Sequence, residues 1–169
     1  MTPTTRFATL LGFASLTFAA VVACSAKDAA APSAGTYTIS FPSTAAAIAA
    51  DSVKVYVFDA ADGGAQLCPS LVIARRSKQA LPTALVEGAS VSPCDLAAGK
   101  GQVTISYGTR AVLAVAQKGA NDFLIGCAIQ NIGEGSTQVP VQLALAATTV
   151  DVPATTCGTL GDHCAGRCQ

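Results

Sequence analysis

The chain has 169 residues, and its ten lysines and arginines balance ten aspartates and glutamates, so the formal net charge is zero. This length suits one domain, and the zero charge argues against nucleic-acid binding driven by phosphate neutralisation. Hydrophobic residues make up 51% of the chain and charged residues only 12%. That balance argues against disorder, because disordered segments combine low hydrophobicity with high net charge.

Residues 1–23 form an apolar run with a single charge at Arg6, which is the pattern of a cleaved signal peptide. The run ends in Val21-Val22-Ala23-Cys24, where a small residue precedes a cysteine. This ending resembles the lipobox of bacterial lipoprotein signal peptides. The resemblance implies cleavage before Cys24, a diacylglyceryl thioether on its sulfur and an acyl group such as palmitate on the new amine. Several acyl chains of this kind would hold the protein stably on a membrane.

Two other interpretations of the N-terminus stay open, namely a buried helix and an ordinary secreted protein cut after Ala23 or Ala26. Ser25 follows the cysteine, and in Gram-negative lipoproteins an uncharged residue there resembles the signal for transfer to the outer membrane. We therefore expect a location in the cell envelope, at the outer membrane. Residues 24–35 lack periodic apolar positions, and they are predicted to be the lipidated cysteine and a flexible tether.

Alternation of apolar and polar residues dominates residues 36–152 and predicts a domain of short β-strands. The predicted strands are 36–41, 53–58, 71–75, 102–107, 111–117, 123–130 and 138–145. The last four are joined by short segments rich in Gly, Asn and Asp, which predicts an antiparallel meander. Only 44–50 is predicted to be helical, and so short a helix needs tertiary support.

About seven short strands without long amphipathic helices between them favour an all-β fold, a single antiparallel β-sandwich. The arrangement resembles small immunoglobulin-like or transthyretin-like modules of bacterial surface proteins. With its lipobox and a cysteine-rich tail at 153–169, the chain also resembles the small lipoproteins that myxobacteria encode. This second resemblance implies a cell-envelope address and no known activity. The aromatic residues after the signal fall on predicted strands, so we expect them in the core rather than on a stacking platform for sugars or bases.

Six cysteines remain when Cys24 is assigned to lipid, and an even number in an exported chain favours three disulfides. The six are Cys68, Cys94, Cys127, Cys157, Cys164 and Cys168. Three lie in the predicted sandwich and three in the tail, so at least one bridge must join the two segments. We expect Cys127 to pair with Cys68 or Cys94, both in long loops, and the other loop cysteine to pair with the tail.

The sequence offers little catalytic chemistry, and we expect no enzyme, no cofactor and no metal site. The only histidine, His163, is adjacent to a cysteine, and this spacing matches neither a C-x-x-C zinc site nor a haem-attachment motif. Zinc or redox chemistry in the tail is the alternative to disulfides. Asp59 with Asp62, or Glu87 with Asp95, could meet in loops as an acid–base pair. The alternative is that these carboxylates belong to an ordinary protein surface, on which ten such groups are not unusual.

Arg75, Arg76 and Lys78 form the chain's basic cluster, which could contact anionic headgroups or lipopolysaccharide phosphate. A solvated strand end is the alternative. The surrounding segment 71–101 has the length of a binding loop. We expect a lipid-anchored envelope protein with a structural or adhesive role, in contact with the membrane and with another envelope protein or a surface polymer. The alternative is a binding module that uses 71–101 to hold a peptide, sugar or lipid.

Overall fold

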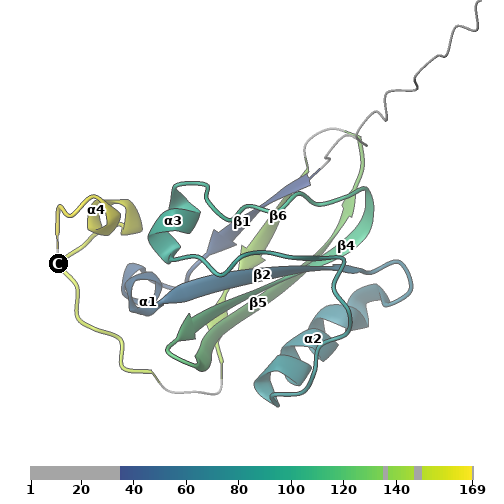
Figure 1. Cartoon of the computed structure of the whole chain (residues 1–169), viewed down its shortest axis with the longest axis horizontal. Coiled ribbons are helices and arrows are strands. Elements are labelled where there is room, and N and C mark those ends of the chain that lie inside the picture. The colour runs from purple at the N-terminus through teal and green to yellow at the C-terminus, as the bar shows by residue number, and fades with distance from the viewer. Residues whose placement is uncertain (1–34, 135–136, 147–149, 169) are drawn as a thin grey trace, which may run out of the picture. The chain divides into compact units, whose positions relative to one another are not determined.

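The computed structural model describes residues 35–134, 137–146 and 150–168. The predicted signal peptide, the predicted lipid attachment site Cys24 and the predicted tether as far as residue 34 lie outside the described residues. Within these limits the chain forms two β-sheets, one large and one small, with helices around them (Figure 1).

The large sheet contains five strands within the described residues, in the order β3-β2-β4-β5-β7. Its centre consists of three long antiparallel strands, β2 (Ser52–Asp59), β4 (Gly108–Lys118) and β5 (Asn121–Ile132). Two short strands form its edges, β3 (Val86–Glu87) and β7 (Ala144–Leu145). The β4–β5 hairpin was predicted by the alternation of apolar residues and by the Gly- and Asn-containing turn between them.

The small sheet pairs β1 (Gly35–Ser40) with β6 (Thr137–Gln142), and the two strands run parallel. It packs on one face of the large sheet, and the larger of two hydrophobic cores lies between them. Tyr37 of β1 is only 2% exposed in this core, and Phe123 of β5 is completely buried. Sequence segments from both ends of the domain therefore meet around one core.

Helix α2 (Leu67–Arg76) follows a 3₁₀ turn (Gly64–Gln66) and covers the opposite face of the large sheet. The second core lies under this helix and includes Tyr56 and Phe58 of β2. The helix contributes its side chains at spacings of one, three and four residues, as an amphipathic helix does. They are Leu67, Cys68, Leu71 and Val72.

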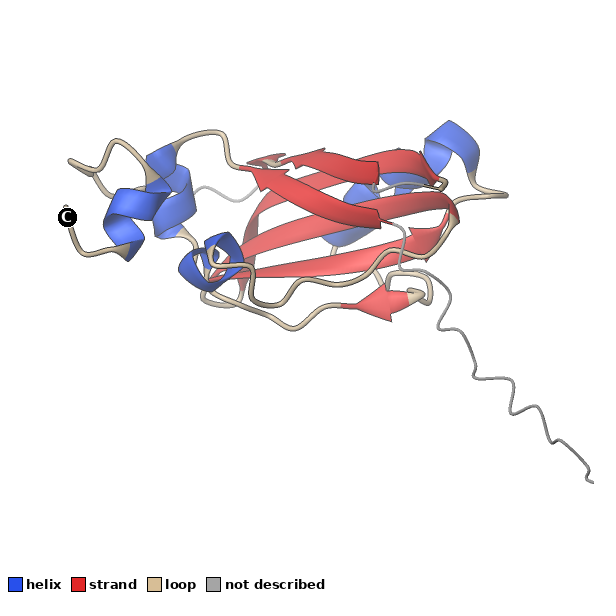
Figure 2. Ribbon diagram, turned by 90° about the horizontal axis from the view of Figure 1, so that it is seen from above, coloured by secondary structure: helices blue, strands red, loops and turns tan. Residues whose placement is uncertain are grey.

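The short helices α1 (Thr44–Ala49), α3 (Pro93–Ala97) and α4 (Leu160–Cys164) gather at one end of the sheets (Figure 2). Each begins at a hydroxyl side chain that accepts a hydrogen bond from a backbone N–H of its first turn. These caps are Ser43, Ser92 and Thr159. The helix predicted at 44–50 is confirmed as α1.

The strand predicted at 71–75 is wrong, because this segment is the second half of α2. The predicted strand starts at Leu71 and therefore omits Leu67 and Cys68, which belong to the apolar face of the helix. Pro69 does not prevent the helix, because in the first turn of a helix its missing N–H breaks no hydrogen bond.

The strand predicted at 102–107 is also wrong, although the inward and outward alternation is correct. Ile105 is completely buried, yet its segment forms a single bridge to Gly35 rather than a ladder. The predicted meander of four strands is also wrong after β5, because β6 does not join the large sheet but pairs with β1. Alternation indicates which side chains face the core, but it does not identify the neighbouring strand.

The β-rich fold is confirmed, whereas a single antiparallel sandwich is not. The small sheet is parallel, and α2 adds a third layer on the far face of the large sheet. Because both faces of the large sheet are covered, residues 111–116 of β4 are buried without interruption. Continuous burial of this kind is typical of a strand with a layer on each side.

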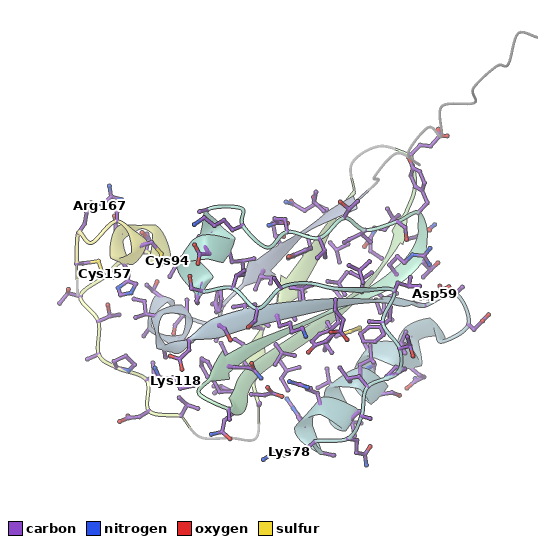
Figure 3. All side chains as sticks on the ribbon, viewed as in Figure 1. Asp59, Lys78, Cys94, Lys118, Cys157 and Arg167 are labelled. Atoms are coloured by element: carbon purple, nitrogen blue, oxygen red, sulfur yellow. A yellow bond between two sulfur atoms is a disulfide. The ribbon has the colours of Figure 1, made fainter. Side chains whose placement is uncertain are left out.

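Three disulfides join the six cysteines of the described residues (Figure 3). Their pairs are Cys68–Cys127, Cys94–Cys164 and Cys157–Cys168. Cys127 thus pairs with one of the two partners expected from the sequence, and the other partner joins the tail. Cys68 and Cys94 lie in helices α2 and α3 rather than in loops.

Candidate functional site

A cavity of about 250 Å³ lies at the C-terminal end of α2, between that helix and the β4–β5 turn. The basic cluster predicted from the sequence contributes three of its lining residues, Arg75, Arg76 and Lys78. The residues that line this basic cavity are Arg75, Arg76, Lys78, Gln79, Gln117, Ala120, Asn121, Asp122, Ile125 and Ala146. The structure therefore brings the cluster to a concave surface and not to a strand end.

The end of α2 positions Lys78 in an uncommon backbone conformation. The amide of Ser77 donates to the carbonyl of Ile73 at 2.9 Å, and the amide of Gln79 donates to that of Ala74 at 2.8 Å. Lys78 stands between them with φ +54°, and no other non-glycine residue of the described chain has a positive φ. Glycine is the usual residue at such a helix end, because a side chain in the left-handed region costs roughly 1–2 kcal/mol.

Arg75 is held against the sheet by a carboxylate. Its Nε lies 2.6 Å from Oδ2 of Asp122, and its Nη2 donates to Oδ1 at 3.1 Å. The side-chain amide of Gln117 donates to the same Oδ1 at 2.8 Å. This carboxylate neutralises one of the three cations that line the basic cavity, so the lining retains two positive charges in excess.

The other two cations are more exposed. Arg76 donates from Nη2 to the carbonyl of Leu145 at 3.2 Å, across the rim of the basic cavity. Lys78 is exposed at the lower end of α2 in Figure 3. The two side chains can approach a phosphate from the same helix end, while Gln79 and Asn121 of the lining supply neutral donors.

Sequence reasoning missed the side chains that β4 and β5 contribute to the basic cavity. Asp122 was assigned to a turn because Asn and Asp are common there, and it lies 47 positions from Arg75. No local pattern indicates a partner at that distance. The long segment 71–101 also does not act as one loop, because it contains part of α2, the edge strand β3 and helix α3.

Three of the four carboxylates considered for acid–base chemistry, Asp59, Glu87 and Asp95, each pair with a basic side chain. Glu87 pairs with Lys54 at 3.0 Å, and Asp59 pairs with Arg110 at 2.8 Å. Hydrogen bonds from the Lys100 ammonium and the Ser92 hydroxyl hold the pKa of Asp95 below its ordinary value. A carboxylate that ionises so readily is a poor general acid near neutral pH.

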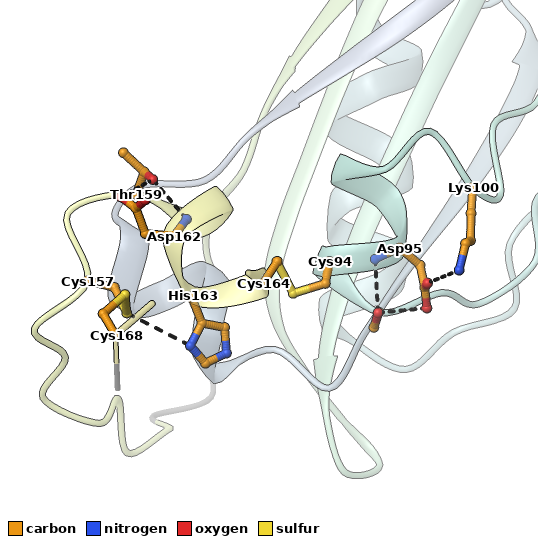
Figure 4. The surroundings of a disulfide bond; sticks show 10 residues. Cys94, Asp95, Lys100, Cys157, Thr159, Asp162, His163, Cys164 and Cys168 are labelled. Atoms are coloured by element: carbon orange, nitrogen blue, oxygen red, sulfur yellow. Dashed lines mark hydrogen bonds and ion pairs between the residues drawn. A yellow bond between two sulfur atoms is a disulfide. The ribbon is translucent and has the colours of Figure 1, made fainter. Parts of the chain in front are cut away.

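The tail forms a second feature with reactive groups. Nδ1 of His163 lies 4.0 Å from Sγ of Cys157, which is bonded to Cys168 (Figure 4). His163 also lines a cavity of about 140 Å³ between α1, α3 and α4. Among the described residues, no group of three or more His, Cys, Asp or Glu side chains is arranged to hold a metal ion.

Comparison of the chain with protein-family models, with curated proteins and with solved structures finds no match. In the part of the chain that the structure describes, none of the helices has the length and hydropathy needed to span a bilayer. The functional argument therefore depends on the chain's own residues.

Proposed function

We propose that the protein is a lipid-anchored binding module of the cell envelope, and that its basic cavity binds phosphate groups of an envelope component without catalysing a reaction on them. The ligand chemistry is a phosphate, carried by a lipid headgroup or by a surface polymer. The anchor is supported by the lipobox-like ending at Cys24.

The observation that carries the binding proposal is Lys78, whose backbone has φ +54° at the rim of a cavity with two excess positive charges. Glycine at this position would relieve the backbone strain, so stability does not explain the lysine. A positive side chain beside the basic cavity does explain it, because each basic residue near an anionic surface contributes about 1 kcal/mol to binding.

The binding test compares full-length protein without acyl chains, which would otherwise insert into any vesicle, with the Lys78→Gly variant in the same form. The free energy of unfolding of the variant is expected to be about 1 kcal/mol higher than that of wild type, because the backbone strain at position 78 is removed. Its affinity for vesicles that contain phosphatidate is expected to fall roughly fivefold, which corresponds to the loss of one cation near the surface. Lys100→Gly is the matched control, since Lys100 is an exposed lysine that does not line the basic cavity.

Inorganic phosphate, followed by NMR, distinguishes the two sources of the ligand. Saturable binding of phosphate alone, weakened by Lys78→Gly, supports a site for phosphate on any carrier. Binding only to the vesicles supports a lipid headgroup. Equal affinity of Lys78→Gly and wild type for both probes would contradict the binding proposal and leave the structural or adhesive role.

The anchor is tested by Cys24→Ser. The variant is expected to lose palmitate labelling and to leave the membrane fraction, because no sulfur is present to carry the diacylglyceryl group. Ser25→Ala is the matched control and is expected to retain the label. Persistent palmitate labelling of Cys24→Ser would overturn the anchor without affecting the binding measurement.

A further inference from the structure

The disulfide Cys157–Cys168 lies beside the chain's single histidine, and neither lines the basic cavity. Helix α4 starts at its cap Thr159, whose hydroxyl accepts from the amide of Asp162 at 3.1 Å. This cap fixes the next residue, His163, so that its Nδ1 lies 4.0 Å from Sγ of Cys157 (Figure 4). The geometry places an ionisable imidazole beside one sulfur of the bond.

The charged groups around His163 are already paired with one another. On its own element, Asp162 lies 2.7 Å from Arg167. Helix α1 carries no ionisable side chain, and Asp51 just after it pairs with Lys118 at 3.0 Å. On α3, Asp95 pairs with Lys100 at 2.8 Å. A positive charge on the imidazole therefore acts mainly on the Cys157 sulfur.

The two sulfurs of this disulfide differ in access. Cys157 is only 7% exposed, whereas Cys168 is half-buried. A thiolate must approach a disulfide in line with the bond, and the sulfur that it does not attack leaves. Access therefore directs attack to Cys168, and Cys157 leaves as the thiolate next to His163.

We infer that Cys157–Cys168 is a thiol–disulfide exchange site that oxidises a dithiol of a partner protein. The first thiolate of the partner bonds to Sγ of Cys168, and the Cys157–Cys168 bond breaks with its electron pair on Cys157. The second thiolate then attacks the mixed disulfide at the partner's sulfur and releases Cys168. Two electrons and two protons pass from the dithiol to the two cysteines, and the partner gains a disulfide.

His163 assists the first step because its imidazolium stabilises the departing Cys157 thiolate or protonates it. An opposite charge within about 4–6 Å lowers a thiol pKa by about one unit or more, and thiols of lower pKa leave faster. Cys68–Cys127 has no such aid, since its cysteines are partly buried against the core between α2 and the large sheet, whereas the chain's single histidine belongs to α4. That disulfide is an internal control in the same molecule.

The experiment treats folded, full-length protein with dithiothreitol between pH 5.5 and 8.5, quenches it by alkylation and follows each disulfide by peptide mass spectrometry. Wild type is compared with His163→Gln at each pH. The ratio of their rates cancels the ionisation of dithiothreitol. The expected ratio for Cys157–Cys168 is roughly three to ten at the acid end of this range, where more of the imidazole carries a positive charge, and it falls towards one as the pH rises.

Two further measurements from the same experiment test the inference. Cys157–Cys168 is expected to be reduced before the other disulfides in wild type, and the rate of Cys68–Cys127 is expected to be the same in both proteins. Earlier reduction of Cys94–Cys164 would overturn the inference. A ratio that does not change with pH would also overturn it, because a histidine with only a packing role would act equally at every pH.

Discussion

Arg75 and Asp122 join the end of α2 to the start of β5 through two contacts, of 2.6 and 3.1 Å, while the two side chains are 26% and 18% exposed. The disulfide Cys68–Cys127 joins the beginning of the same helix to the same strand. One helix is thus fixed at both ends to one strand, by a covalent bond and by an ion pair. The basic cavity lies at the end held by the ion pair.

Removing Arg75 is expected to loosen this end of α2. Arg75→Gln leaves Asp122 partly buried without its cation, and the loss is expected to lower the free energy of unfolding by about 1–3 kcal/mol. Chemical denaturation measures this change. Lys100→Gln, which removes an exposed ion pair, is the control and is expected to leave stability unchanged. Equal effects of the two variants would show that the Arg75 pair does not hold the helix.

The three disulfides are expected to differ in their contribution to stability. In the chain-entropy description, a bridge stabilises more when it closes a longer loop. The sequence separation is 59 for Cys68–Cys127 and 11 for Cys157–Cys168. Replacing both cysteines by alanine is expected to cost about 4 kcal/mol for the first and about 3 kcal/mol for the second. Denaturation of the two double variants measures the order, and a larger loss from the tail bridge would contradict it.

The sequence predicted those parts of the fold that depend on neighbours in the chain. The β4–β5 hairpin follows from alternation on both sides of a turn in which Gly119 has φ +57°. Helix α2 was missed because its stripe begins at Leu67, before the segment that was taken as a strand. The pairing of β1 with β6 was missed because it joins Gly35 to Thr137, and no local pattern encodes a partner so distant.

The candidate site, too, could be predicted only where its residues are neighbours in the chain. The sequence shows Arg75, Arg76 and Lys78 as a cluster because they lie within four positions. It does not show that Asp122 neutralises one of them, or that the backbone of Lys78 is left-handed. Both facts depend on where α2 ends and on what packs beneath it. For the disulfides, the division into three cysteines in the domain and three in the tail predicts that the two are joined, but it leaves the partner of Cys127 open between two cysteines.

The close approach of β5 and the end of β6 depends on Gly126. A Cβ atom at this position would lie 2.2 Å from the carbonyl oxygen of Gln142 and 2.8 Å from its carbonyl carbon. Gly126→Ala is therefore expected to destabilise the protein by about 2–3 kcal/mol, because backbone must shift to admit the methyl group. Gly133→Ala is the matched control, since nothing lies within 4 Å of its Cβ. Thermal unfolding of both variants tests the contact. A Gly126→Ala variant as stable as wild type would show that the backbone does not approach Gly126 this closely.

Burial of Tyr37 between the sheets makes the protein sensitive to alkali. Desolvation raises the pKa of Tyr37 above its ordinary value of 10.0, against a smaller opposing effect of a hydrogen bond from the Val103 backbone. The unfolded chain therefore releases this proton at a lower pH than the folded chain does. It follows that the stabilisation is complete below pH 10.0 and declines as the pH rises towards the folded pKa.

Tyr37→Phe isolates this effect from other groups that titrate in alkali. Lys54 also contributes a decline, because its hydrogen bond to Glu87 raises the pKa of its ammonium above 10.5. The difference in free energy of unfolding between wild type and Tyr37→Phe removes that shared contribution. At neutral pH the variant is expected to lose about 1 kcal/mol with the hydrogen bond from its hydroxyl to the Gly101 carbonyl, and above pH 10.0 the difference is expected to shrink. Urea unfolding at pH 8, 10 and 11 measures it, and a difference that is constant with pH would mean that Tyr37 ionises equally in both states.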